Sequence, residues 1–269
     1  IPVSGLIQVG ELARADRYTY LPSVGIVIML AWGIQYFIQN KNICENIVFP
    51  AMITVLSINV VLTWHQCGYW KNDVKLWNHA LIVTKDNYFA HNNIGIALQA
   101  KGKINEAMYH FNKAISIEPG IHGYYMNRGN TYIRLGQYQQ AINDYTKAIF
   151  LKPDDAEVFY NRGSLYGQIG HYNPALEDLN KTIAFKPGHF KAYNNRGIVY
   201  NKTGSYDKAL DDFNEAIRLK PDYADAYNNR ASLHLNVKNL NLGCEDLRKA
   251  CRLGSCTKFK AAENKGLCR

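Results

Sequence analysis

The sequence predicts an all-α protein, a superhelical solenoid of helix-turn-helix repeats preceded by a transmembrane helical hairpin. Three observations lead to this prediction. Four prolines stand 34 residues apart, at Pro119, Pro153, Pro187 and Pro221. Glycine columns keep the same step, at Gly95, Gly129, Gly163 and Gly197 and at Gly102, Gly136, Gly170 and Gly204. Two long apolar stretches precede them. A fixed period of about 20 to 50 residues indicates stacked units, because one unit cannot bury its own apolar face.

Each unit reads as two helices joined by a turn. In one of them, Gly129 lies on the first helix, where the missing side chain lets the partner helix approach closely. Gly136 breaks the chain into a turn, as glycine does most cheaply. The next residues lie three or four apart and share one face of a second helix: Tyr138, Ala141, Tyr145 and Ala148. Pro153 ends that helix, because proline cannot donate the helical hydrogen bond.

The 34-residue pattern is typical of tetratricopeptide repeats (TPR). The register places a capping half-repeat helix in residues 71–87, with its helix from Asp73 to Val83, and a C-terminal cap helix in residues 258–269. Between them lie five repeats, at residues 88–121, 122–155, 156–189, 190–223 and 224–257. The fifth is degenerate, because Ala231, Lys238 and Gly243 replace signature residues.

A membrane hairpin is expected before the repeats. Residues 1–17 read as an extramembrane loop, and residues 18–70 contain two apolar stretches at about 18–38 and 47–64, without Asp, Glu, Lys or Arg. Both are long enough to cross a hydrocarbon core of about 30 Å, and Tyr and Trp residues near their ends fit interfacial belts. Two buried helices of a soluble domain are the alternative, but repeats offer no deep core to receive them.

One stretch, from Ala15 to Gly25, resembles the start of a late membrane helix in polytopic membrane glycosyltransferases with C-terminal TPRs, relatives of the dolichyl-phosphate-mannose protein mannosyltransferases. The Thr-Trp-His-Gln run ending at Gln66 and the segment from Tyr69 to Trp77 are similar to the junction in that family. The resemblance implies catalytic acidic residues in early loops that this chain does not include. It also implies that the repeats are periplasmic or lumenal. In contrast, the few charged residues that flank the two apolar stretches weakly favour placing these flanks in the cytoplasm.

Arg17, with Tyr18 and Tyr20, could contact a polyprenyl-phosphate donor, since a guanidinium forks onto phosphate oxygens. The alternative is an interfacial anchor, with the basic group among lipid headgroups and the tyrosines in the aromatic belt.

An asparagine column lies on the first helix of every repeat. Its members are Asn93, Asn127, Asn161, Asn195 and Asn229. An amide side chain can donate and accept at once, which matches the backbone of an extended peptide. The column resembles the asparagine ladder of O-linked N-acetylglucosamine transferase, which holds substrate peptides. The alternative is that these amides bond locally between units.

An arginine column follows directly, at Arg128, Arg162, Arg196 and Arg230. These side chains could receive acidic ligands. However, acids recur with the same period at Asp144, Asp178 and Asp212, which favours structural pairing between helices.

Four of the six cysteines lie near the C-terminus: Cys244, Cys251, Cys256 and Cys268. The first two are seven residues apart on one helix, too far to bridge each other. Two pairings remain, 244 with 256 and 251 with 268, or 244 with 268 and 251 with 256. Either would fix the cap helix and suit an oxidising compartment. Reduced packing thiols are the alternative, and the spacing matches no common zinc pattern.

The remaining chemistry is sparse. Bases and acids interleave in every unit despite a net charge of +9, which argues against nucleic-acid binding. No catalytic set, metal site or cofactor motif emerges, and His110, His171 and His189 are expected at solvated positions.

The sequence therefore predicts an integral membrane protein held by residues 18–64, with an extracytoplasmic solenoid whose concave TPR face binds protein or extended peptide. The preferred hypothesis is the C-terminal region of a membrane glycosyltransferase-like protein that presents acceptor polypeptides. The rival is a non-enzymatic membrane-tethered scaffold for assembling protein complexes.

Overall fold

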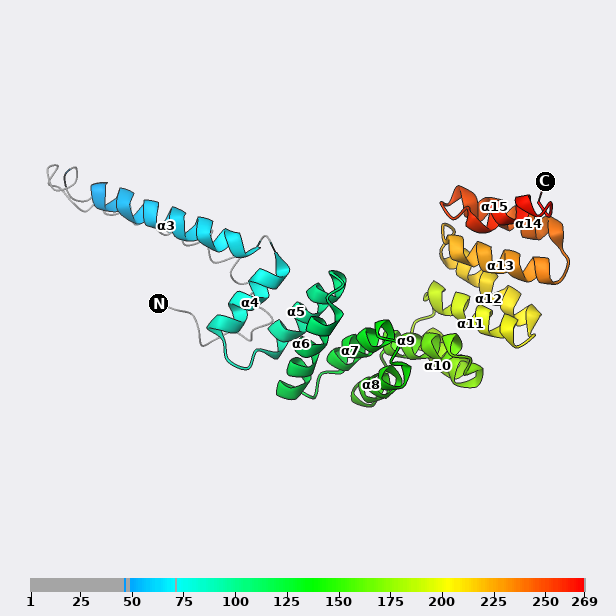
Figure 1. Ribbon diagram of the computed structural model, residues 1–269, viewed down its shortest axis with the longest axis horizontal. Helices are drawn as coiled ribbons and strands as arrows, with labels where there is room; N and C mark the ends of the chain where they lie inside the picture. The colour runs from blue at the N-terminus through cyan, green and yellow to red at the C-terminus, as the bar shows by residue number, and fades with distance from the viewer. Residues whose placement is uncertain (1–45, 47–48, 71, 269) are drawn as a thin grey trace. The chain divides into compact units, whose positions relative to one another are not determined.

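A computed structural model describes residue 46, residues 49–70 and residues 72–268 of the chain. Within these ranges the protein forms thirteen α-helices and no strand (Figure 1). The chain divides into two compact units, Ile1–Pro119 and Gly120–Arg269. The all-α prediction and the helix-turn-helix repeats are confirmed for the described residues.

The first unit contains α3 (Phe49–Trp70), α4 (Asp73–Val83), α5 (Tyr88–Ala100) and α6 (Ile104–Ile117). Helices α5 and α6 form the first hairpin, and α4 packs on α5 in the position of a second helix of the repeat. Trp77 of α4 lies edge-on to Phe89, with ring centroids 5.4 Å apart. Trp77 also covers a core that includes Ile94 and Phe111. The apolar face of the hairpin is thus buried by α4.

The predicted membrane hairpin stays a prediction. Among the described residues, no helix combines the length and the apolar character needed to cross a membrane. This includes α3, which contains most of the second apolar stretch. The first stretch, residues 18–38, lies outside the described residues, as do Arg17, Tyr18 and Tyr20.

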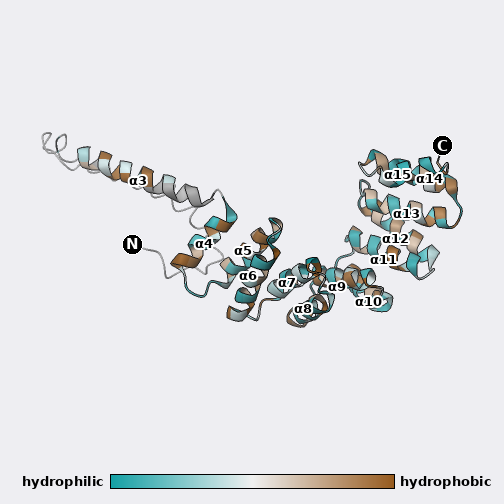
Figure 2. Cartoon of the chain, in the orientation of Figure 1, coloured by the Kyte–Doolittle hydropathy of each residue, from teal (hydrophilic) through white to brown (hydrophobic). Residues whose placement is uncertain are grey.

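The second unit is a stack of helical hairpins. It comprises α7 (His122–Arg134), α8 (Tyr138–Leu151), α9 (Ala156–Gln168), α10 (Tyr172–Phe185), α11 (Phe190–Lys202), α12 (Tyr206–Leu219), α13 (Ala224–Asn236), α14 (Leu240–Arg252) and α15 (Thr257–Asn264). Each odd-numbered helix up to α13 pairs with the next one, each pair contacts its successor, and α15 packs on α14. Figure 2 shows hydrophobic and hydrophilic residues interleaved along these helices, as expected where one face is buried.

The glycine columns have the roles that the spacing predicted. A Cβ atom at Gly129 would lie 2.8 Å from a ring carbon of Tyr145, so only glycine allows α7 and α8 to approach this closely. Gly136 adopts a φ of 72°, in the left-handed region that favours glycine. In the fifth repeat Lys238 stands at the corresponding position and adopts a φ of 62°. The degenerate repeat therefore keeps the turn geometry, although the left-handed conformation is strained for lysine.

Candidate functional site

The asparagine column forms part of a hydrogen-bonded row across the first helices of the second unit. Asn195 on α11 donates through Nδ2 to Ser164 Oγ (2.9 Å) and Tyr160 Oη (3.3 Å), both on α9. Asn229 on α13 donates through Nδ2 to Asn194 Oδ1 on α11 (2.9 Å). Asn194 in turn donates to Asn195 Oδ1 (3.2 Å). The row joins three consecutive first helices, and we call the surface that it follows on α9, α11 and α13 the first-helix face.

The other members of the column differ from these two. In the first unit, Asn93 donates to the carbonyl oxygen of Phe89 in its own helix, at 2.8 Å. Asn127 is partly buried on α7. Asn161 is also partly buried, and its amide makes no hydrogen bond to any other residue in the described part of the chain. Identical residues in identical register are therefore engaged to different extents.

Three residues of this row were missed in the sequence: Tyr160, Ser164 and Asn194. One signal for them was available, because Asn194 and Asn228 form a second column with the same 34-residue step. Tyr160 stands in the same column, one period before Asn194, but as a tyrosine it did not signal an amide contact. Nothing in the spacing marked Ser164, since its role depends on which side chain of the next repeat contacts it.

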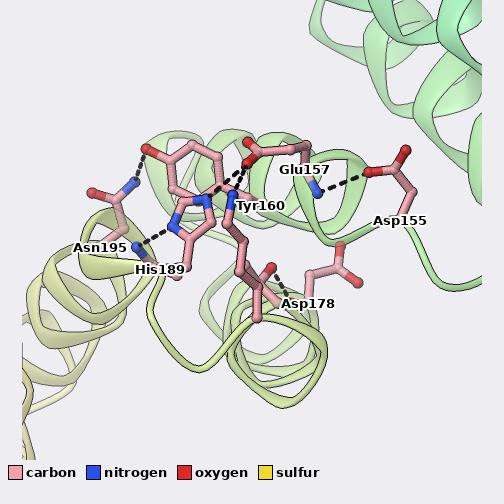
Figure 3. A network of polar contacts seen from close by, with 9 residues as sticks. Asp155, Glu157, Tyr160, Asp178, His189 and Asn195 are labelled. Carbon is pink, nitrogen blue, oxygen red and sulfur yellow. Dashed lines mark hydrogen bonds and ion pairs between the residues drawn. The ribbon is translucent and has the colours of Figure 1, made fainter.

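A polar network extends the row at the junction of α10 and α11 (Figure 3). The ring centroids of Tyr160 and His189 lie 4.6 Å apart. His189 Nδ1 accepts a hydrogen bond from the backbone N–H of Ala192 at 3.1 Å. The opposite ring nitrogen, Nε2, lies 3.5 Å from Glu157 Oε1, which also receives Lys186 Nζ at 2.8 Å. The hydrogen bond from Lys186 lowers the pKa of Glu157, and burial raises the pKa of the Tyr160 hydroxyl.

The expectation of a solvated His189 is wrong, because its side chain is buried as the N-terminal cap of α11. An accepting Nδ1 cannot carry a proton, so the cap requires the neutral ring with its proton on Nε2. His171 is exposed as expected, whereas His110 is partly buried.

The arginine column makes the structural pairs that the shared period predicted. Arg162 donates to both carboxylate oxygens of Asp178, through Nε at 2.8 Å and Nη2 at 2.9 Å. The same two-pronged contact joins Arg128 with Asp144, Arg196 with Asp212 and Arg230 with Asp246.

The arginines also reach back to the preceding repeat. Arg162 Nη1 donates to Thr146 Oγ1 (2.8 Å), and Arg196 Nη1 donates to Asn180 Oδ1 (2.7 Å). Each of these arginines therefore links its own first helix to the second helices of two repeats. The hydrogen bonds to Asp144 raise the pKa of the Arg128 guanidinium. Guanidinium groups engaged in this way hold helices together and have few donors left for an acidic ligand.

Two disulfides fix the C-terminal end. Cys244 is joined to Cys268, and Cys251 is joined to Cys256. Of the two pairings that the sequence left open, the structure has this one. Ala262 of α15 packs with the first pair in a small core that also contains Leu247. The cap helix is thus held both by apolar contacts and by covalent bonds.

The described residues contain no group of three or more His, Cys, Asp or Glu side chains that could hold a metal ion.

A cavity of about 570 Å³ lies among α12, α13 and α14, lined in part by Leu210, Arg230 and His234. His234 stands where the second, third and fourth repeats have tyrosines, at 132, 166 and 200. The arginine in this cavity is already paired with Asp246, so its charge is neutralised.

Comparisons with known proteins agree with this architecture. A family model described as "TPR repeat" matches residues 129–170. Two models described as "Tetratricopeptide repeat" match residues 88–120 and 190–223, and residues 156–189 and 224–253. Together the matches cover more than half of the chain.

Curated relatives carry the name of a transferase. The chain is 32% identical over 135 residues to mouse "Protein O-mannosyl-transferase TMTC3", a match that covers 50% of this chain and 15% of the relative. It is 27% identical over 136 residues to the Drosophila melanogaster protein of that name, with the same two shares. The predicted resemblance to glycosyltransferases with TPRs is confirmed at this level. The matches span only about 15% of the length of these relatives.

Solved structures show the same fold. A tetratricopeptide repeat protein from Parabacteroides merdae has a TM-score of 0.59 and 26% identity, covering 66% of this chain and 70% of that chain. YrrB, described as a TPR protein with an unusual peptide-binding site, has a TM-score of 0.56 and 21% identity, covering 70% of this chain and 97% of its own.

Proposed function

Because this chain belongs to the tetratricopeptide repeat family, we propose that its repeats bind an extended polypeptide along the first-helix face. A role in protein interaction follows from the family and the fold. The finer proposal concerns which residues take part. The observation that carries it is the Asn161 amide, which occupies the register of Asn195 on the first-helix face but makes no hydrogen bond to any other described residue.

The asparagines of the column differ in how many of their amide groups are hydrogen-bonded within the protein. Asn195 uses its donor and its acceptor within the protein, so it fixes the spacing of α9 and α11. Asn229 uses its donor, while its Oδ1 accepts no hydrogen bond from the described residues. Asn161 has both groups open, which suits the N–H and C=O of a peptide backbone regardless of side chain. Peptide capture by the second unit therefore depends on Asn161 and on the acceptor of Asn229, and Asn127 continues the column within this unit.

The chain is further proposed to be the C-terminal region of a membrane glycosyltransferase-like protein, where the repeats present acceptor polypeptides. The named relatives support this proposal. Residues 18–64 would hold it in the membrane, with Arg17, Tyr18 and Tyr20 at a lipid phosphate. The two disulfides support a periplasmic or lumenal position of the repeats, because such bonds persist in oxidising compartments.

A non-enzymatic membrane-tethered scaffold for assembling protein complexes is the second candidate, because the family and the fold support protein interaction without requiring catalysis. The sequence before Ile1 distinguishes the two. Further membrane helices, with an acidic pair in the first extracytoplasmic loop, support the transferase, and a parent protein without them refutes it.

Peptide capture can be tested with a fluorescent, reduced and carboxymethylated polypeptide as an unfolded probe. We expect Asn161→Ala to weaken binding, measured by fluorescence anisotropy, and to leave the urea midpoint unchanged. Asn195→Ala should lower the midpoint, because it removes bonds between helices. Asn214→Ala, on the exposed side of α12, serves as the control and should leave probe binding unchanged. Unchanged affinity in the Asn161 variant would refute the peptide site.

A further inference from the structure

Two tripeptides in the repeats match the acceptor pattern for N-linked glycosylation, Asn-x-Ser/Thr. They are Asn180-Lys181-Thr182 and Asn201-Lys202-Thr203. The pattern alone is a weak signal, since a glycan is bulky and must lie on the surface of the folded protein. The structure separates the two candidates, because Asn180 lies on a second helix and Asn201 lies near the end of a first helix.

Asn180 is exposed on α10. Its Oδ1 accepts the hydrogen bond from Arg196 Nη1, while its Nδ2 makes no hydrogen bond to the described residues. Nδ2 is the atom that carries an N-linked sugar, so a glycan there leaves the contact with Arg196 in place. The corresponding positions of other repeats are exposed too, at Asn112, Thr146, Asn214 and Arg248. The register thus places this column in solvent throughout.

Asn201 has the opposite surroundings. Its side chain is partly buried, and its Oδ1 is inaccessible to solvent without a partner among the described residues. The corresponding positions are occupied by Ile133, Gly167 and Leu235, which are also partly buried. Leu235 shows what this position does, because it packs against the core of the C-terminal end. A glycan on Asn201 would therefore start from a partly buried side chain at a position that packs against neighbouring helices, whereas Asn180 is exposed.

We propose that the folded protein carries an N-linked oligosaccharide on Asn180 and none on Asn201. The donor class is a polyprenyl-pyrophosphate-linked oligosaccharide. Nδ2 of Asn180 attacks the anomeric carbon, forming the N–C bond as the C–O bond to pyrophosphate breaks. The polyprenyl pyrophosphate leaves with the bonding electron pair, and Nδ2 loses one proton, which passes to the leaving pyrophosphate or to water. No oxidation or reduction takes place.

The proposal rests on the proposed lumenal position of the repeats, since the donor and its transferase act there. It also sets an order of events. Thr182 is fully buried and donates to the carbonyl oxygen of Asp178, so its hydroxyl is not accessible once α10 has formed. Transfer therefore precedes folding of this repeat. Because Asn180 lies on a second helix, the glycan leaves the first-helix face open for a polypeptide.

The test expresses the full chain in cultured animal cells with a flexible linker and an Asn-Gly-Thr acceptor appended after Arg269. Monomeric protein from gel filtration is treated with peptide N-glycosidase F and compared by gel mobility. We expect two glycans on the unchanged chain and one on Asn180→Gln, whose amide can still accept from Arg196. Asn201→Gln and Asn214→Gln should each keep two, the latter being the matched exposed position without an acceptor pattern.

Each other outcome overturns a defined statement. A chain modified only at the appended acceptor refutes glycosylation of Asn180 while the lumenal position stands. Loss of one glycan in Asn201→Gln refutes the exclusion of that site. A chain modified at neither place refutes the lumenal position itself, and the inference fails with it.

Discussion

Removal of one arginine from the column tests whether these side chains hold the stack together. Arg162 and Asp178 form an ion pair whose side chains are 16% and 4% exposed. Met in place of Arg162 keeps much of the apolar stem but removes the charge and all three hydrogen bonds. It leaves the Asp178 carboxylate buried without its partner. Such a loss costs about 3–5 kcal/mol of unfolding free energy.

The double substitution Arg162→Met with Asp178→Leu removes the stranded carboxylate as well. Replacing both members of a buried pair by apolar groups is often neutral. We therefore expect the double variant to recover to within about 1 kcal/mol of the unchanged protein. Urea denaturation followed by circular dichroism measures both, and hydrogen exchange in α9 and α10 reports whether the loss is local, because repeats unfold in part independently.

An exposed pair provides the matched control. Arg218 bonds to Glu215 three residues earlier on the same helix, and its side chain is 70% exposed. Arg218→Met should leave the urea midpoint unchanged, since such surface pairs contribute little. If Arg162→Met behaves like this control, or if the double variant is as unstable as the single one, the column does not hold the helices together.

Three further predictions concern single positions. Lys238→Gly should raise the unfolding free energy by about 0.5–1 kcal/mol in urea denaturation, because lysine is strained at a φ of 62°; no gain would mean that the turn is not strained. Gly129→Ala should lower the unfolding free energy by about 1–3 kcal/mol, because the added methyl group overlaps the facing ring of Tyr145. Gly123→Ala is the control and should not lower it, since a Cβ atom there meets nothing within 4 Å. Equal effects of the two substitutions would contradict the close approach of α7 and α8. Burial is the main cause that lowers the pKa of His91 and His110, whose Nδ1 atoms lie 3.0 Å apart. The neutral pair thus stabilises the first unit above the ordinary histidine pKa of about 6.5, and this stability is lost as the pH falls below it, because the unfolded chain then binds more protons. The protection factors of the α5 and α6 amides, which correct for the intrinsic pH dependence of hydrogen exchange, should be lower at about pH 5 than at about pH 7.5, and replacing His110 by Gln should reduce the difference.

The repeat architecture could be predicted from local chemistry. Glycine at a left-handed turn, glycine at a close approach and proline at a helix end each act within a few residues, so their spacing is visible in the chain. The arginine pairs were also within reach, because Arg162 and Asp178 recur with the period of the fold. Because both columns recur with the same period, the arginine and the aspartate of each repeat have the same spatial relation in every repeat.

The candidate site depends on contacts that no period encodes. Asn161 and Asn195 occupy the same register, yet only Asn195 meets a hydroxyl from the preceding repeat. The difference arises from non-identical neighbours, such as Ser164 and Tyr160, that lie 31 and 35 residues away. His189 was misread for a related reason, since a polar residue before a helix becomes buried when it caps that helix against a neighbouring ring.

By itself, the sequence determined the class of fold, the register of the repeats and the ion pairs between their helices. Only the tertiary structure decided which asparagine amides are used between helices, which cysteines are joined, and which of two glycosylation patterns lies in solvent. The physical reason is distance. Turn, cap and helix preferences act between near neighbours in the chain, whereas hydrogen bonding and burial depend on the side chains that stacking brings together from successive repeats.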